Sequence, residues 1–241
     1  MDDAARIAEA FTAGALIRAV NFHLTPRTRE DQYDREFALY ARHFEPVTAE
    51  DLDDVMTGGR WRKSKPGLIL AFYNGYRNNF EVARPLLEKH GLIGWFFIVT
   101  GFVNASDQPA FAARHSITPD DPAPDGRMAL SWDEVALLDR SHVVASHTRS
   151  HARASLGAAE LEAEAGGSQR DFVSALGHPV RAFAWNGGAA FGEHPDADRA
   201  LEAAGFQFVM SNFRIQRLRH WPSGTGQGSM PQANPVRSPS T

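Results

Sequence analysis

The sequence contains no cysteine among its 241 residues. This absence excludes a disulfide framework and thiolate metal sites, so any metal must be bound by nitrogen and oxygen ligands. No apolar stretch approaches the ~20 residues that a membrane-spanning helix needs, and no signal peptide precedes the first helical pattern. Positive charge is not in excess either, since the net charge is -4 and the pI is about 6.2. We therefore expect a cytoplasmic protein without a nucleic-acid or membrane partner, and the sequence indicates no oligomeric state.

Short apolar runs alternate with helical patterns along the chain. Most runs are apolar at every position, which is typical of parallel strands covered on both faces, although a short buried helix gives the same pattern. Strands alternating with helices indicate βα units and hence an α/β fold with a parallel sheet or barrel. We expect strands at residues 17–22, 68–72, 95–100, 143–146, 182–185, 207–210 and 215–218.

Several expected helices have readable ends. Ser131 and Glu134 form a capping box, with the serine as N-cap and the glutamate at the third helical position. Three other helical patterns are followed by a glycine, where a left-handed C-terminal cap is expected. These helices span residues 79–90, 158–176 and 196–204, and a further one starts at Thr48.

Two segments lie outside this alternation. Residues 104–127 are rich in Pro, Asp and Ala and are expected to form a long excursion between a strand and a helix. Residues 222–241 contain few large apolar side chains, so they cannot bury enough surface to offset their ordering entropy. The sequence therefore predicts one domain at residues 1–221 and a disordered tail at residues 222–241.

Two histidines follow the expected strand at residues 143–146. His147 and His151 are four residues apart, which places both imidazoles on one face of a helical turn, close enough to share a divalent cation. Functional sites of α/β folds collect at the carboxyl ends of the strands, which favours a metal site. Two exposed loop histidines are the alternative, because the chain has ten histidines and chance pairs are common.

The expected strand at residues 68–72 also ends in polar residues, beginning with Tyr73 and Asn74. Both this strand and the one before His147 should end at the same edge of the sheet or barrel. Asn74 is therefore expected beside His147 and His151.

These segments together resemble the polysaccharide deacetylase family, also called the NodB-homology domain or carbohydrate esterase family 4. Residues 71–76 are similar to its first motif, Thr-Phe-Asp-Asp-Gly-Tyr, and residues 147–151 are similar to its second motif, which carries two histidines. Residues 181–188 resemble the third, an Arg followed by an aromatic strand, Pro and Gly. Leu218 and His220 resemble the last, a Leu and a His near the C-terminus. The motif order is that of the family, and the likeness spans about residues 17–221.

The resemblance implies a distorted (β/α) barrel of about seven parallel strands with a site at its mouth. It also implies that the first Asp of the first motif is the general base. The second Asp binds Zn²⁺ or another divalent cation together with His147 and His151. The metal lowers the pKa of a bound water that attacks an acetyl carbonyl, and a late histidine, here His220, protonates the leaving amine. The implied partner is a carbohydrate or another N-acyl substrate.

The chain departs from the family at the positions that carry this chemistry. Tyr73 stands at the base position, and a phenol with an ordinary pKa of about 10 is mostly protonated at neutral pH. Asn74 stands at the position of the metal-binding carboxylate; its amide oxygen brings no charge, so we expect weak metal binding at most. Asn186 replaces the proline of the third motif. Arg181, which the resemblance implies orients the base, is present.

Three aromatic or ionisable residues complete the candidates, each with an alternative. Trp132 is expected to edge a sugar-binding groove or to anchor the start of its helix. Trp185 is expected beside Asn186 at the substrate or in the core. His220 is either the acid or a surface residue.

We therefore expect a polysaccharide deacetylase-like protein whose hydrolase activity is lost or altered. An active N-deacetylase that recruits another carboxylate, such as Asp133 or Asp139, is one alternative. A non-catalytic carbohydrate-binding module that keeps the groove is the other. A tightly held metal favours an enzyme, and an empty His147–His151 pair favours the binding module.

Overall fold

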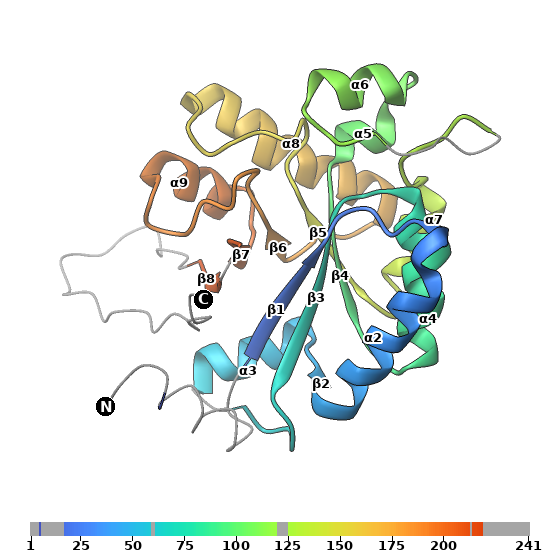
Figure 1. Cartoon of the computed structure of the whole chain (residues 1–241). Helices are drawn as coiled ribbons and strands as arrows, with labels where there is room; N and C mark the ends of the chain where they lie inside the picture. The colour runs from blue at the N-terminus through green and yellow to red at the C-terminus, as the bar shows by residue number, and fades with distance from the viewer. Residues whose placement is uncertain (1–4, 6–16, 59–60, 120–124, 213, 219–241) are drawn as a thin grey trace.

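The computed structural model describes residues 5, 17–58, 61–119, 125–212 and 214–218. These residues form a curled, eight-stranded sheet with helices around it (Figure 1). The strands lie in the order β1-β3-β4-β5-β6-β7-β8, and β2 pairs with the start of β3. Every pair is parallel except β7 with β8. The expected distorted (β/α) barrel of about seven parallel strands is confirmed.

The bounds of the strands agree well with the apolar runs in the sequence. Those expected at residues 17–22 and 143–146 are found with the same bounds, whereas the one expected at 95–100 ends earlier because Thr100 begins a helix. The second strand was not predicted, because two residues are too short to give a pattern. The strands are Ile17–Phe22 (β1), Glu45–Pro46 (β2), Gly67–Asn74 (β3), Gly94–Ile98 (β4), Val143–Ser146 (β5), Ala182–Phe183 (β6), Phe208–Met210 (β7) and Ile215–Arg217 (β8).

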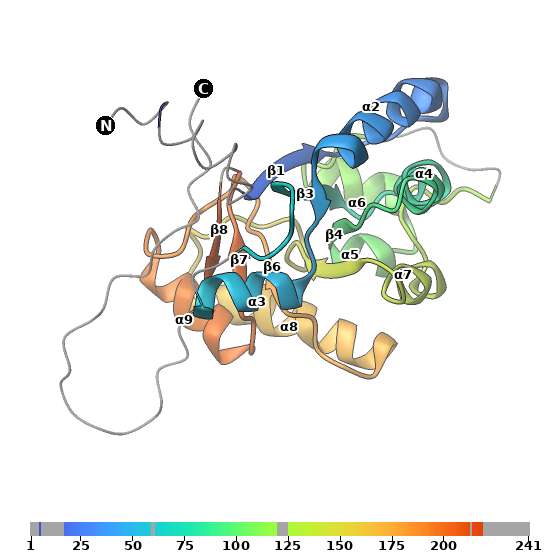
Figure 2. The same ribbon diagram turned by 90° about the horizontal axis from the view of Figure 1, so that it is seen from below.

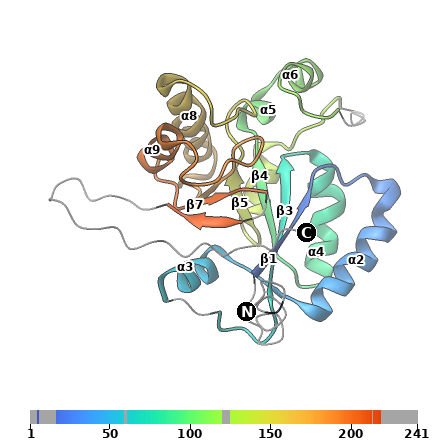
Figure 3. The same cartoon turned by 60° about the vertical axis from the view of Figure 1, so that its left-hand side comes forward.

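The helices cover the sheet on two flanks. Figure 3 shows α8 and α9 side by side on one flank and α2 and α4 together on the other. No helix within the described ranges has the length and apolar character needed to cross a bilayer. The helical segments are Arg27–Arg29 (η1), Glu30–His43 (α2), Ala49–Gly58 (α3), Asn79–Ala83 (η2), Arg84–Lys89 (α4), Thr100–Asn104 (α5), Gln108–Arg114 (α6), Trp132–Leu138 (α7), Ala158–Leu176 (α8) and Pro195–Ala203 (α9).

Local sequence signals set the ends of these helices. The capping box of Ser131 and Glu134 starts α7 as expected, with both reciprocal hydrogen bonds present. Helix α8 ends at Gly177, whose φ of 81° is the left-handed conformation that glycine adopts without strain. The pattern at residues 79–90 forms the π-helical segment η2 followed by α4. The excursion at residues 104–127 contains α6, which the sequence did not predict.

Side chains of β3 alternate between two cores, as the two-residue period of a strand requires. Leu68, Leu70 and Phe72 pack in the layer between the sheet and the helices. Ile69, Ala71 and Tyr73 pack in the barrel interior.

The interior is closed at the start of the strands by α3, which contributes Ala49 and Leu52 to the same cluster as Ile17 of β1. In the view from below, α3 lies in front of this end of the sheet (Figure 2), and Arg217 of β8 pairs with Asp53 of α3 at 2.9 Å. The opposite end, where β3 and β5 finish, carries the candidate site.

Candidate active site

The polar ends of β3 and β5 are tied together through β4. Asn74 is the last residue of β3, and its carbonyl accepts a hydrogen bond from Val99 N–H at 3.3 Å. His147 follows β5 directly, and its N–H donates to the carbonyl of Ile98 at 2.8 Å. The two motifs that the sequence singled out therefore meet at one edge of the sheet, as parallel strands dictate.

The imidazole of His147 is buried and held in one tautomer. Its Nδ1 lies 2.8 Å from the carbonyl oxygen of Ala184, so Nδ1 carries the hydrogen and donates it. Burial, reinforced by the neighbouring His151, lowers the pKa of His147 to about 3. The ring is therefore neutral at pH 7, and its Nε2 presents a lone pair.

His151 is oriented in the same way by a different carbonyl. Its Nδ1 lies 2.8 Å from the carbonyl oxygen of His115, and Asn186 Nδ2 donates to the His151 carbonyl at 2.9 Å. Burial lowers the pKa of His151 as well. Its Nε2 is thus a second unprotonated nitrogen, which is the form in which histidine binds a metal.

The segment that joins the two histidines is a loop rather than the helical turn suggested by their spacing. Thr148 has a φ of 70° and His151 a φ of 61°, both in the left-handed region, which interrupts a right-handed turn. The two rings are nevertheless neighbours, with centroids 5.1 Å apart in a T-shaped arrangement. Zn–N bonds of ~2.1 Å and tetrahedral angles put two rings that share a cation roughly 5 Å apart, so this spacing is compatible with a shared metal.

Asn74 carries a buried oxygen without a partner. Its Nδ2 donates to the Tyr76 hydroxyl at 3.3 Å, and that hydroxyl donates to the Thr118 carbonyl at 2.8 Å. Within the described part of the chain, Asn74 Oδ1 is buried and accepts no hydrogen bond. The φ of Asn74 is 75°, a conformation that asparagine tolerates better than most residues. Leaving a buried acceptor without a donor costs free energy, so this oxygen is suited to binding a cation or accepting a hydrogen bond.

These groups fit a borderline cation such as Zn²⁺, but only with neutral ligands. The candidate donors are the Nε2 atoms of His147 and His151, whose rings are neighbours, and the unpartnered Oδ1 of Asn74 at the end of β3. Among the described residues, no three His, Asp or Glu side chains come together as a metal-binding group. A divalent ion bound here lacks the anionic ligand that strengthens binding in sites of this kind.

Tyr73 fills the base position with an aromatic ring in a stacked column. Its ring stacks on His23 at 5.5 Å and on Phe97 at 5.1 Å, and Phe97 stacks in turn on Trp95 at 6.4 Å between centroids. The rings of His147 and Tyr73 form a T-shaped pair with centroids 5.1 Å apart. Burial raises the pKa of Tyr73 further above its ordinary value. The phenol is therefore protonated at neutral pH and is a poor general base.

Among the described residues, the side chain of Arg181 contacts acids of α3 and makes no contact with Tyr73, so the orienting contact that the resemblance implied is not made. Arg181 directly precedes the two-residue strand β6. Its guanidinium pairs with Glu50 at 3.1 Å and with Asp53, both on α3. Arg181 therefore fastens α3 to the closed end of the barrel.

The two tryptophans pack as structural side chains. Trp132 donates from Nε1 to Asn104 Oδ1 at 2.8 Å and meets Phe172 of α8 edge-on, so it anchors the start of α7. Trp185 is 2% exposed and packs against Phe183 at 4.7 Å, which places it in the core. Asn186, in contrast, reaches the site through His151. His220 lies outside the described residues, as does the tail at residues 222–241.

The acids considered as replacement carboxylates have other surroundings. Asp139 pairs with His178 at 2.8 Å, and Asp133 is exposed in the first turn of α7. The site also includes His23, which the sequence places just beyond the first strand, either at the mouth or in a solvated loop, and whose ring stacks on Tyr73. The carbonyls of His115 and Ala184 are groups that the sequence did not indicate. Backbone carbonyls have no side-chain signature, so only the fold reveals them.

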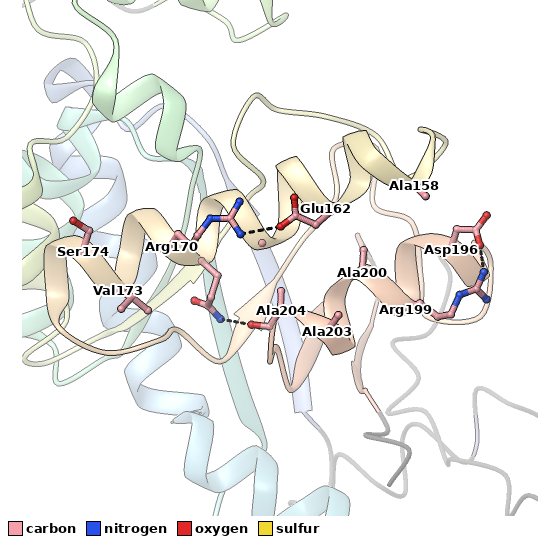
Figure 4. A pocket seen from close by; sticks show the side chains of 12 residues that line it. Ala158, Glu162, Arg170, Val173, Ser174, Asp196, Arg199, Ala200, Ala203 and Ala204 are labelled. Atoms are coloured by element: carbon pink, nitrogen blue, oxygen red, sulfur yellow. Dashed lines mark hydrogen bonds and ion pairs between the residues drawn. The ribbon is translucent and has the colours of Figure 1, made fainter. Parts of the chain in front are cut away.

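A groove of about 630 Å³ lies elsewhere, between α8 and α9 (Figure 4). Its charged side chains pair with each other, Arg170 with Glu162 and Arg199 with Asp196. The described residues that line it include no histidine. It therefore offers no alternative to the site at the barrel mouth.

Comparison with solved structures supports the same fold. The Streptococcus pyogenes deacetylase PplD, in complex with acetate, is 12% identical with a TM-score of 0.64, covering 84% of this chain and 86% of that one. IcaB from Ammonifex degensii is 19% identical with a TM-score of 0.61, covering 81% and 83%. The BpsB deacetylase domain from Bordetella bronchiseptica is 15% identical with a TM-score of 0.60, covering 82% and 89%.

At the level of sequence, comparison with curated proteins finds no match. The family model described as polysaccharide deacetylase matches residues 61–209, a range that contains Tyr73, Asn74, His147 and His151. That range is more than half of the chain. It runs from before β3 into β7 and so includes β3 and β5, which precede the candidate residues. The chain belongs to the polysaccharide deacetylase family.

Proposed function

We propose that this protein is a polysaccharide deacetylase-like protein whose hydrolase activity is lost or strongly reduced. The observation that carries the proposal is the position of Tyr73. The base position holds a buried phenol stacked between His23 and Phe97, with no carboxylate in its place. Loss of a general base typically slows a reaction roughly 10²–10⁴-fold.

The proposal assigns weak binding of a divalent cation to His147, His151 and Asn74. Two unprotonated imidazole nitrogens and an unpartnered amide oxygen support this assignment. A bound cation supplies Lewis-acid chemistry, polarising an acyl carbonyl or a water molecule. The protein's own contribution is to keep both imidazoles neutral by burying them and to fix their tautomers through the carbonyls of Ala184 and His115.

Binding of a carbohydrate or another N-acyl ligand without hydrolysis is the second candidate function. The exposed His23 ring, stacked on Tyr73, favours it, because a flat ring at the mouth offers an apolar platform beside polar groups. An active enzyme with a recruited base is less well supported, since Asp139 is paired with His178.

The proposal is tested by following acetate release from N-acetylglucosamine oligomers with added Zn²⁺ or Co²⁺. We expect little turnover by the wild-type protein. Tyr73→Phe, which removes only the hydroxyl, should behave like the wild type. Robust turnover by the wild type that persists in Tyr73→Phe would contradict the loss of activity and indicate a base elsewhere. In parallel, calorimetric titration with the same oligomers measures whether the ligand binds without being cleaved.

A further inference from the structure

The loop between the two candidate metal-binding histidines presents its hydrogen-bond donors to one side chain of α8. Glu164 Oε2 accepts from the backbone N–H of Arg149 and from that of Ser150, at 2.8 Å in each case. Glu164 Oε1 accepts from the Ser150 hydroxyl at 2.5 Å. Both oxygens of one carboxylate are therefore engaged by two consecutive loop residues.

These two residues lie between the two strained positions of the loop. Thr148 and His151 both have positive φ, with values of 70° and 61°. A residue with a Cβ, and above all a β-branched one such as threonine, adopts this conformation only where its surroundings hold it there. The geometry of the loop thus depends on contacts from outside it.

The opposite edge of the loop is held by α5. Thr100 N–H donates to the Thr148 carbonyl at 3.3 Å, and Gly101 N–H donates to the Arg149 carbonyl at 2.8 Å. The start of α5 therefore takes the loop's carbonyls while Glu164 takes its N–H groups. Arg149 adds a further link to α8 through its ion pair with Asp171 at 3.3 Å.

We infer that Glu164 is a positioning residue of the site, which holds the loop in the conformation that keeps His151 beside His147. A carboxylate is suited to this task because ionised acceptors make stronger hydrogen bonds to N–H groups than neutral ones do. The inference rests on the proposed function in taking His147 and His151 as the pair that binds a cation.

The test compares Glu164→Ala and Glu164→Gln with Glu162→Gln. Glu162 is an exposed acid of the same helix that pairs with Arg170, so its variant controls for the loss of one negative charge on α8. The first readout is imidazole ¹H–¹⁵N NMR of the metal-free protein. We expect His151 to lose its single Nδ1–H tautomer in Glu164→Ala, while His147 keeps the tautomer fixed by Ala184. Glu164→Gln, which retains one acceptor oxygen, should lie between Glu164→Ala and the wild type.

The second readout is calorimetric titration with Zn²⁺. Loss of a group that orients a metal ligand typically weakens metal binding by roughly 10–100-fold, and we expect this range for Glu164→Ala. An unchanged His151 tautomer in Glu164→Ala, or an equal change in Glu162→Gln, would overturn the inference. If the wild type binds no Zn²⁺, the metal-binding part of the proposed function fails, and the NMR readout still decides the role of Glu164.

Discussion

Asn74 Nδ2 donates to the hydroxyl oxygen of Tyr76 at 3.3 Å, and this contact fixes the orientation of the amide. The hydroxyl hydrogen of Tyr76 is committed to the Thr118 carbonyl at 2.8 Å, so the Tyr76 oxygen acts as the acceptor. The amide oxygen of Asn74 is therefore the end left without a partner among the described residues. The residue is thus integrated into its surroundings as an amide, and an aspartate there requires the Tyr76 hydroxyl to turn.

The first prediction concerns Asn74→Asp. We expect Zn²⁺ to bind on the order of tenfold or more tightly, because the substitution adds an anionic ligand at little change in volume. Without metal, the variant should unfold at a lower temperature than the wild type, since a buried carboxylate is left uncompensated. Calorimetric titration and thermal unfolding measure the two effects. Asn212→Asp, which adds the same charge at an exposed position, is the control. Equal Zn²⁺ affinities of Asn74→Asp and wild type would show that Asn74 is not a ligand.

The second prediction concerns recovery of deacetylase activity. Tyr73→Asp combined with Asn74→Asp should release acetate faster than Asn74→Asp alone, because it adds the missing general base. Recovery should be partial, since removing a ring stacked on Phe97 leaves a gap, and truncation of a buried aromatic side chain typically costs about 3–5 kcal/mol. Thermal unfolding checks that the double variant is folded.

Arg181 provides a matched test of how the new base is oriented. Because its guanidinium pairs with Glu50 and Asp53 on α3, Arg181→Ala in the double variant should lower thermal stability without selectively lowering turnover. A loss of turnover much larger than the loss of folded protein would restore the orienting role implied by the family resemblance.

The third prediction concerns stability at acid pH. His142 is buried; its Nδ1 accepts from the Gly94 N–H at 3.3 Å, and its Nε2 lies 3.8 Å from Glu88 Oε1. Burial lowers the pKa of His142 to about 4 from an ordinary value of 6.5. Between these values the unfolded chain binds a proton that the folded protein does not. Stability should therefore fall as the pH falls from 6.5 to about 4, and His147, with a pKa of about 3, acts in the same direction.

Urea unfolding at several pH values separates the contribution of His142. His142→Asn keeps an acceptor for the Gly94 N–H but has no titrating ring, so its stability should decline less steeply, by about 1.4 kcal/mol per pH unit for one proton. The control is His178→Asn. The pKa of His178 is raised, so its contribution to stability is lost as the pH rises, which is the opposite direction to that of His142. An acid slope for His142→Asn equal to that of the wild type would contradict the assignment.

The fourth prediction uses two glycines near the histidine loop. A Cβ at Gly101 would lie 2.3 Å from the Arg149 carbonyl oxygen, a backbone atom that cannot swing away. Gly101→Ala should therefore displace the loop, lower the unfolding temperature and shift the NMR signals of His151. Gly166 lies inside α8, where an added Cβ meets only the flexible side chains of Glu162 and Arg170. Gly166→Ala should stabilise the protein by up to about 1 kcal/mol, because alanine is the better helix former.

Much of the fold could be predicted from the sequence because its signals are local. A partly apolar run gave the bounds of β1 and an apolar run those of β5, and the periodic pattern ending at Gly177 gave α8. That Asn74 and His147 come at the same edge of the sheet followed from the parallel arrangement alone. Helix α6 was missed because its seven residues, QPAFAAR in a Pro- and Asp-rich stretch, give too short a pattern.

The contacts that shape the site could not be predicted in this way, because they join distant parts of the chain. His151 is oriented by the carbonyl of His115, 36 residues away. Arg181 is bound to Asp53, 128 residues away, which removes it from the base position that its place in the motif suggested. Such pairings depend on how the elements pack, and no local spacing encodes them.

The stacked rings of His23, Tyr73, Phe97 and Trp95 also limit which substitutions at the mouth of the barrel the fold can accept. Aspartate at position 73 alone introduces a buried charge without a cation and leaves Phe97 and His23 without the ring between them. Aspartate at position 74 alone introduces a buried charge without a base. Either single step lowers the stability of the metal-free fold before the pair can raise turnover. A change to two carboxylates at positions 73 and 74 is therefore expected to pass through an intermediate whose metal-free fold is less stable than that of the present protein.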